Sequence, residues 1–290
     1  MAFRRDRMVA ATVVSSLTIH GADWHAAVVM YFDPGRLVLD VAQALCVALP
    51  GAGIPGFLLR LRGRGWSLVA PLSLVLTIAA IGVSSASADV LAWIALVLVP
   101  LGCALALGWA AHGARPWLVL AVVPLLAAAL AAPDDPLGRV SRLLLIVGSC
   151  VTAGRLLAGG APLRFLKAGV VAMAAIDAVL IFGDFYGERF AAFDSAVPAV
   201  GLPQLQVADI GDISTGYGDF FVAGLVGAIV AVERRSQAAA AVATLATAQV
   251  YNQLLLVVDS ISETAPPALV LLAFEAWHRW TYSRARPRGV

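Results

Sequence analysis

The stretch Thr215-Gly216-Tyr217-Gly218-Asp219-Phe220-Phe221 opens an apolar segment that runs to about residue 232. Inserting an aspartate near the centre of a membrane helix costs roughly 2.5–3.5 kcal/mol, so such a residue marks a functional site by default. The whole chain has 290 residues, of which 61% are hydrophobic and 13% are charged. A soluble domain is about 45–50% apolar and about 25% charged. The sequence therefore predicts an all-α, polytopic membrane helix bundle and excludes the soluble enzyme classes.

Apolar segments that approach the roughly 20 residues of a spanning helix recur along the chain. We predict nine core transmembrane helices from them, with an additional N-terminal segment at about 8–31. That segment could be a spanning helix, an uncleaved signal anchor or a signal peptide. The run Pro50-Gly51-Ala52-Gly53-Ile54-Pro55-Gly56 predicts a kink or break in the first core helix. The nine core segments lie at about 36–59, 67–87, 90–111, 116–132, 140–159, 168–184, 217–232, 238–258 and 265–281.

The predicted membrane protein has three parts. Residues 1–35 hold the basic, signal-anchor-like N-terminal segment, residues 36–164 hold core helices one to five, and residues 165–290 hold core helices six to nine. The third part includes a hydrophilic loop at 185–216, which is too long for a simple connector. This loop could be an ordinary solvated loop, a gate for substrate or a source of short strands.

The distribution of basic residues predicts the orientation in the membrane. If the 8–31 segment crosses the bilayer, 16 of the 20 basic residues fall on one face, and the other face holds Arg36, Arg139, Arg142 and Arg189. The positive-inside rule then places the loop outside and the basic C-terminal tail in the cytoplasm. We therefore predict a multi-pass protein of the bacterial plasma membrane. The basic residues are scattered between apolar segments, which indicates contact with a lipid bilayer and not with nucleic acid.

Several polar or reactive residues are assigned structural roles. Cys46, Cys103 and Cys150 lie far apart in apolar segments, without the spacing of a zinc site, which predicts thiols that pack between helices. We expect no metal site and no cofactor. Glu275 and His278 could pair with each other or with lipid headgroups. The other such residues are Asp184, Asp259 and Glu263, expected at the solvated outer interface, and Gln249, Tyr251, Asn252 and Gln253, expected to bond neighbouring helices.

A second carboxylate, Asp177, lies in the sixth core segment with three apolar residues on each side. A proton, a partner or water must neutralise it. Consecutive spanning helices are antiparallel, so Asp177 and Asp219 are expected to differ by only a few ångströms in depth. Two close carboxylates share one proton, because both cannot ionise at low cost. The ionised one can activate a water as general base, and the protonated one can polarise a carbonyl and supply a proton to a departing amine. The pattern leaves open which residue takes which role.

Glycine and proline mark the two neighbouring motifs. Gly216 and Gly218 permit close backbone approach and unusual dihedral angles beside a catalytic carboxylate. In the last segment, Pro266 and Pro267 disfavour helix at residue 265. Unwound backbone at membrane depth is tolerated only where it lines a cavity, and its free groups could pair with an extended substrate.

Taken in order, the Asp177 segment, the Gly216-Tyr217-Gly218-Asp219 motif and the Pro267-Ala268-Leu269 triplet resemble the motifs of the GxGD intramembrane aspartyl proteases. This family comprises presenilin and signal peptide peptidase with their archaeal relatives, and the resemblance, over about residues 165–282, is to a prokaryotic member. The family has nine spanning helices, with the aspartates in the sixth and seventh and the triplet in the ninth. The chain departs from the family at Ile176, where a tyrosine is usual.

The resemblance implies an aspartic endopeptidase that hydrolyses peptide bonds within transmembrane segments. Asp177 and Asp219 would be the catalytic pair, and Gly216, Tyr217 and Gly218 would form the active-site motif. The resemblance implies a substrate-binding role for Pro267, Ala268 and Leu269, and no cofactor. The expected substrates are transmembrane helices or signal peptides that run from the inside to the outside, since the predicted orientation is that of signal peptide peptidase. The sequence carries no indication of accessory subunits.

Three alternatives stay open. A proton-coupled transporter or channel could use Asp177 and Asp219 as relay groups, although this leaves the glycines and the last motif unexplained. A prepilin-type peptidase also uses a Gly-x-Gly-Asp carboxylate pair, but it usually has a lysine after the motif, where this chain has Phe220. The chain could also be an inactive homologue of the protease family.

Overall fold

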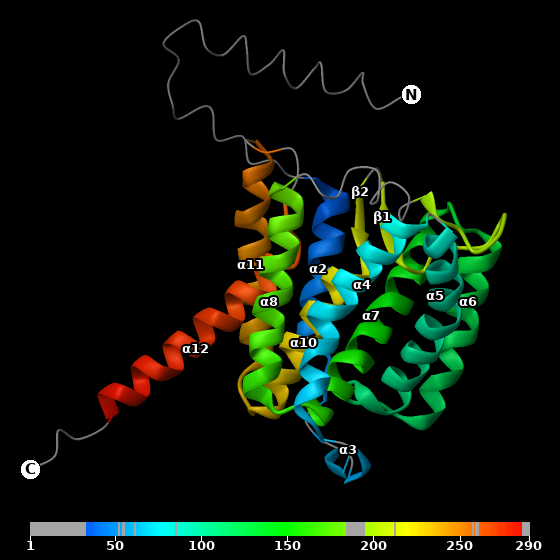
Figure 1. The fold of residues 1–290 in the computed structure, drawn as a ribbon. Coiled ribbons are helices and arrows are strands. Elements are labelled where there is room, and N and C mark those ends of the chain that lie inside the picture. Colours follow the sequence, from blue (N-terminus) through cyan, green and yellow to red (C-terminus); the bar gives the residue numbers. More distant parts are fainter. Residues whose placement is uncertain are drawn as a thin grey trace, which may run out of the picture. The chain divides into compact units, whose positions relative to one another are not determined.

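The chain is mostly helical in the computed structural model, which describes residues 33–51, 53, 56–60, 62–84, 86–183, 195–211, 213–256, 258 and 261–285. One antiparallel hairpin supplies the strands found in this part of the chain. The fold class is therefore all-α with one small hairpin (Figure 1). The predicted N-terminal segment at 8–31 lies outside the described residues.

Every core segment that the sequence predicts contains helical structure. Short 3₁₀ or π turns extend several of the α-helices at one end. The elements are α2 (Pro34–Ala48), α3 (Gly56–Arg60), a 3₁₀ turn (Arg64–Leu68) leading into α4 (Val69–Val83), α5 (Ala86–Leu105) with a π turn (Ala106–Ala110), a 3₁₀ turn (Pro116–Ala121) leading into α6 (Val122–Ala131), α7 (Pro136–Gly160), α8 (Leu163–Phe182), α10 (Tyr217–Val232), α11 (Gln237–Asn252) with a 3₁₀ turn (Gln253–Leu256), and α12 (Ala265–Ala285).

Within the described residues, four helical stretches are long and apolar enough to cross a membrane. They are Arg64–Val83, Ala86–Ala110, Pro136–Gly160 and Leu163–Phe182. Two further apolar helices, Pro116–Ala131 and Tyr217–Val232, are shorter. These lengths fit a membrane protein, whereas the count of nine spanning helices stays a prediction.

The first core segment is broken where its prolines predict a break. α2 ends at Ala48, and α3 begins at Gly56. A proline removes a backbone donor and clashes with the preceding turn, so Pro50 cannot continue α2. The chain after α2 pairs instead with the end of the π turn, since Gly51 N–H donates to the Ala110 carbonyl at 2.8 Å.

α7 lies at the centre of the helix packing and contacts α10, α5, α6 and α2. A Cβ atom on Gly154 of α7 would lie 2.3 Å from the carbonyl oxygen of Gly224, and one on Gly224 of α10 would lie 2.4 Å from that of Cys150. Only glycine permits backbones to approach this closely, as in the small-residue interfaces of membrane helices. Cys46, Cys103 and Cys150 are all free and buried among the helices, which confirms the packing role predicted for them.

A short hairpin precedes α10. Strands β1 (Val207–Ile210) and β2 (Ile213–Gly216) pair antiparallel, and Gly211 takes a positive φ of 65° in the turn, a conformation that glycine adopts without penalty. Asp209 of β1 forms an ion pair with Arg142 of α7 at 2.9 Å. Of the three possibilities for the loop at 185–216, short strands therefore form in its last part, and β2 leads directly into α10.

Candidate active site

Asp177 lies on α8, near its C-terminal end, and only 6% of its surface is exposed. Its Oδ2 atom accepts hydrogen bonds from the Ser262 hydroxyl at 2.5 Å and from the Thr264 hydroxyl at 2.9 Å. Both donors come from the non-helical segment directly before α12. A buried carboxylate needs such partners, because desolvation without them is costly.

Asp219 is the third residue of α10, whose N-cap is Gly216 in an extended conformation. A backbone hydrogen bond from Gly216 reaches the Asp219 carboxylate. This is half of a capping box, in which an acidic side chain at the third helical position bonds the backbone N–H of the N-cap residue. The N-terminal end of the helix dipole also favours a negative charge here. The local sequence therefore holds the carboxylate back over the start of its own helix.

The structure brings the two aspartates to one cavity of about 410 Å³. α8 and α10 contact each other, and the two carboxyl groups lie close enough to interact electrostatically. Asp177 is five residues before the last residue of α8, and Asp219 is two residues after the first residue of α10. At a rise of about 1.5 Å per residue, similar distances from neighbouring helix ends give similar depths. The geometry meets the expectation that the two side chains can face each other.

The cavity is lined mostly by apolar side chains, with polar ones among them. Side chains of α4 and α5, including Ile78, Ile94 and Leu98, form much of the walls. Its polar lining residues include the two aspartates, Ser149, Gln206 and Thr264. Such a cavity can hold an apolar chain segment and present one of its polar bonds to the carboxylates.

Gly216 and Gly218 both line this cavity, but their conformations are ordinary. Gly216 has φ −71° and ψ 153°, and neither glycine has a positive φ. A Cβ atom on Gly216 would lie 3.5 Å from Asp219 Oδ2, and one on Gly218 would lie 3.5 Å from Met173 Cε, which are normal contacts. The expectation of unusual dihedral angles is therefore wrong here, whereas close approach of a substrate to this backbone stays a prediction. The two glycines instead leave the wall beside Asp219 free of side chains.

Tyr217, between the glycines, fastens α10 to its surroundings. Its hydroxyl lies 2.9 Å from the Ser149 hydroxyl of α7, and its ring stacks on Phe221 with 6.4 Å between centroids. Its backbone N–H donates to the Gln206 carbonyl at 2.9 Å. The residue thus contributes both to the cavity wall and to the packing of α10 on α7.

Pro267, Ala268 and Leu269 form the first turns of α12 but are not among the described residues that line the cavity. Pro267 and Ala268 are buried, and Leu269 is 46% exposed. Ala265 is expected to be non-helical, but α12 begins at this residue, one position earlier than the prolines predict. Unwound backbone does precede the helix at 261–264, and Thr264 is the residue of this region on the cavity wall. A substrate-binding role for the triplet stays a prediction.

Neither Ser262 nor Thr264 is among the predicted site residues, although both bond the Asp177 carboxylate. Glu263 is not simply solvated at an outer interface, because it forms an ion pair with Arg36 and accepts a hydrogen bond from the Thr215 hydroxyl at 2.7 Å. One hydroxyl residue on each side of an acid, separated by a single alanine from a Pro-Pro pair, is the signal that could have pointed to this segment. The predicted interhelical bonds of α11 are confirmed for Gln249 and Asn252, which donate to Asp40 of α2.

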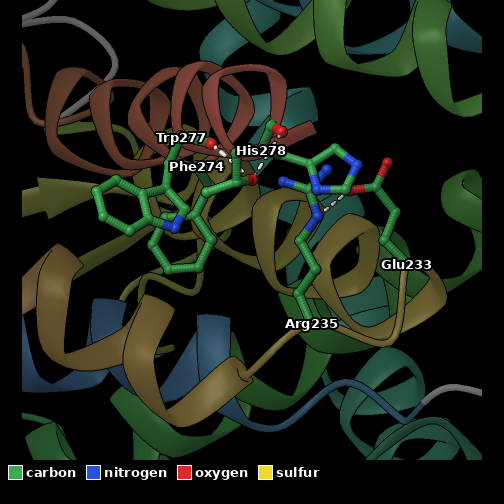
Figure 2. A pocket seen from close by; sticks show the side chains of 6 residues that line it. Glu233, Arg235, Phe274, Trp277 and His278 are labelled. Carbon is green, nitrogen blue, oxygen red and sulfur yellow. Dashed lines mark hydrogen bonds and ion pairs between the residues drawn. The ribbon is translucent and has the colours of Figure 1, made fainter. Parts of the chain in front are cut away.

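A second cavity, of about 540 Å³, lies at the opposite end of α10 from Asp219. Figure 2 shows Glu233, Arg235 and His278 on one side of this cavity and the aromatic residues Phe274 and Trp277 on the other.

Beside this second cavity lies the Lys167 cluster, which consists of Lys167, Glu233, Arg235 and Glu275. Lys167 pairs with both glutamates, at 2.6 Å from Glu275, and Arg235 bonds the same two at 2.9 and 2.8 Å. Glu275 therefore has ion-pair partners that neither predicted option included.

Comparisons with models of protein families, with curated proteins and with solved structures found no match to this chain.

Proposed function

We propose that the chain is an intramembrane-cleaving aspartyl protease of the GxGD type, an aspartic endopeptidase that hydrolyses peptide bonds within transmembrane segments. One observation carries the proposal. Asp177 and Asp219 come from different helices, yet they line the same cavity and interact electrostatically. Paired carboxylates that share a proton can act together as general base and general acid.

The proposed reaction needs only these two side chains and a water. The ionised carboxylate takes a proton from the water, whose oxygen attacks the carbonyl carbon of the scissile peptide bond. The protonated carboxylate polarises the carbonyl oxygen and then protonates the departing amine as the C–N bond breaks. The apolar walls would limit the access of bulk water to the site, which strengthens the interactions of the two carboxyl groups with the water and the carbonyl.

The proposed setting is the bacterial plasma membrane, with nine core helices and a cytoplasmic C-terminus. The ion pairs agree with the membrane face that the sequence predicts for each partner. Arg36 pairs with Glu263, and Arg142 pairs with Asp209, so residues assigned to the outside find partners also assigned there. The Lys167 cluster joins residues assigned to the inside.

The proposed substrates are transmembrane helices or signal peptides whose N-termini lie inside. A mostly apolar cavity that contains two carboxylates suits an apolar segment that has unwound locally, because a helical peptide bond is already hydrogen-bonded. The bilayer would deliver such segments, and the walls formed by α4 and α5 would receive them.

The test is cleavage of single-span substrates of both orientations in proteoliposomes. We expect product from the wild type with substrates that run from inside to outside. Asp177→Ala and Asp219→Ala should each lower the rate by at least about a hundredfold, as loss of an acid–base group does. A transition-state mimic with a hydroxyl at the scissile position should block the wild type.

The matched control is Asp40→Asn. Asp40 is also a buried carboxylate, held by Gln249 and Asn252, but it is not among the described residues that line the cavity. This variant should keep its cleavage rate per folded molecule. Well-folded wild-type protein that cuts neither orientation would contradict the proposal, and proton-linked flux would then be measured to test the transporter alternative.

A further inference from the structure

The three residues Ser262, Glu263 and Thr264 lie between α11 and α12 and contact α8, which carries Asp177, and β2, which leads directly into the helix that carries Asp219. Ser262 and Thr264 reach Asp177 on α8, whereas Glu263 reaches Thr215, the residue directly before the N-cap of α10. One short segment therefore bonds Asp177 directly and also bonds the residue before the helix that carries Asp219. We call these three residues the 262–264 clamp.

The contact with Asp177 is fully buried. Ser262 is 0% exposed and Thr264 is 2% exposed, so both hydroxyls are shielded from bulk solvent. The two hydroxyl oxygens lie 2.8 Å apart, and both lie within 2.9 Å of Asp177 Oδ2, so the three oxygens form a triangle. A carboxylate oxygen bonded to two donors from one rigid segment has little freedom to rotate.

Glu263 fastens the clamp on its other side. Its carboxylate accepts the Thr215 hydroxyl at 2.7 Å and pairs with Arg36 at the start of α2. Its backbone carbonyl accepts a hydrogen bond from Gln43 at 2.7 Å. The Glu263 carboxylate also lies close enough to Asp219 to interact with it electrostatically. The clamp is thus held by α2 and by the end of β2, and not only by its covalent neighbours.

We propose that Ser262 and Thr264 are positioning residues, which hold the Asp177 carboxylate in register with Asp219, and that Glu263 fastens them to the start of α10. The inference rests on the proposed function, because register matters only if the two carboxylates act on one bond. A displacement of about 1 Å in a reacting group can lower a rate by about a hundredfold. A residue that only stabilised the fold would have no such effect per folded molecule.

The experiment compares Ser262→Ala and Thr264→Val with the conservative variant Thr264→Ser. Losing one hydroxyl should lower kcat roughly tenfold to a hundredfold while KM changes less than about twofold, since the lost hydroxyl bonds the Asp177 carboxylate and acts on its orientation. Thr264→Ser keeps the donor and should restore most of the rate. The matched control is Thr244→Val, because Thr244 is an equally buried hydroxyl that bonds the Ala240 carbonyl within α11.

A second readout is independent of cleavage. The infrared band of the Asp177 carboxyl, identified by its loss in Asp177→Asn, should shift in Ser262→Ala and Thr264→Val but not in Thr264→Ser or Thr244→Val. If both hydroxyl-deleting variants keep the wild-type kcat and an unmoved band, the clamp has no positioning role. If the wild type cuts no substrate, the proposed function fails, and the band then shows by itself whether the hydroxyls hold the carboxylate.

Discussion

At the scale of the residue, the absence of side chains at Gly218 matters more than its backbone conformation. Gly218 lines the cavity beside Asp219, and a Cβ atom there would make a normal contact with Met173. Sequence motifs with glycine are often read as a need for special dihedral angles, but here the backbone would accept any small residue. What the position requires is room.

Substitutions at Gly218 of increasing size test this requirement. Gly218→Ala should fold and cleave within a fewfold of the wild type, whereas Gly218→Leu should fold and lose at least about tenfold in rate, because its side chain occupies the cavity. Cleavage rate per folded molecule, with thermal unfolding as the control for folding, measures both. Equal activity of the alanine and leucine variants would contradict a role for this wall in holding substrate.

At the scale of the element, α10 depends on glycine for a different reason. Gly224 faces the backbone of α7, where a Cβ atom would lie 2.4 Å from the Cys150 carbonyl oxygen. Gly224→Ala should therefore lower the free energy of unfolding by about 1–3 kcal/mol, the usual effect of overpacking. Gly218→Ala, the same change on the same helix, is the matched control and should have little effect. Unfolding in detergent micelles compares the two variants, and equal stabilities would rule out the close packing of α7 and α10.

The Lys167 cluster holds three helices together at the end away from the aspartates. Lys167 of α8 pairs with Glu233, the C-cap of α10, and with Glu275 of α12. In a double-mutant cycle, Lys167→Gln and Glu275→Gln should show a coupling of about 0.5–3 kcal/mol, as expected for partly buried contacting charges.

Arg164→Gln is the matched control for this cycle, since Arg164 is exposed and stacks on Phe165. Arg164→Gln combined with Glu275→Gln should give additive effects on the free energy of unfolding. Additive effects for Lys167 and Glu275 as well would mean that the ion pair between them contributes nothing to stability.

At the scale of the whole molecule, the predicted orientation in the membrane is open to a direct test. Ser195 and Ser236 are both exposed, and the three native cysteines are buried, so single cysteines at these two positions will dominate labelling. Ser195→Cys should react with a membrane-impermeant maleimide in intact cells. Ser236→Cys should react only after permeabilisation, because it lies in the loop predicted to be cytoplasmic. The opposite pattern would reverse the topology and the expected substrate orientation.

The sequence predicts helices and the cavity carboxylates well, and their polar neighbours poorly. Apolar runs locate helical structure in every predicted core segment, because such a run has few other solutions. The isolated polarity of Asp177 and the Gly-x-Gly-Asp motif point to two residues that do meet at one cavity. The hydrogen-bond partners of Asp177 come instead from a segment more than 80 residues later in the chain. Helix packing brings that segment to Asp177, so no local sequence pattern predicts the contact.

The setting of the only lysine in the chain makes it a native reporter group. The Lys167 ammonium lies between two carboxylates, and its side chain is 17% exposed. Amine-reactive dyes and cross-linkers require an accessible amine, so this largely buried side chain should resist them while α8, α10 and α12 stay together. Its rate of modification would then follow the separation of these helices in time, in the unmodified protein and with no engineered label.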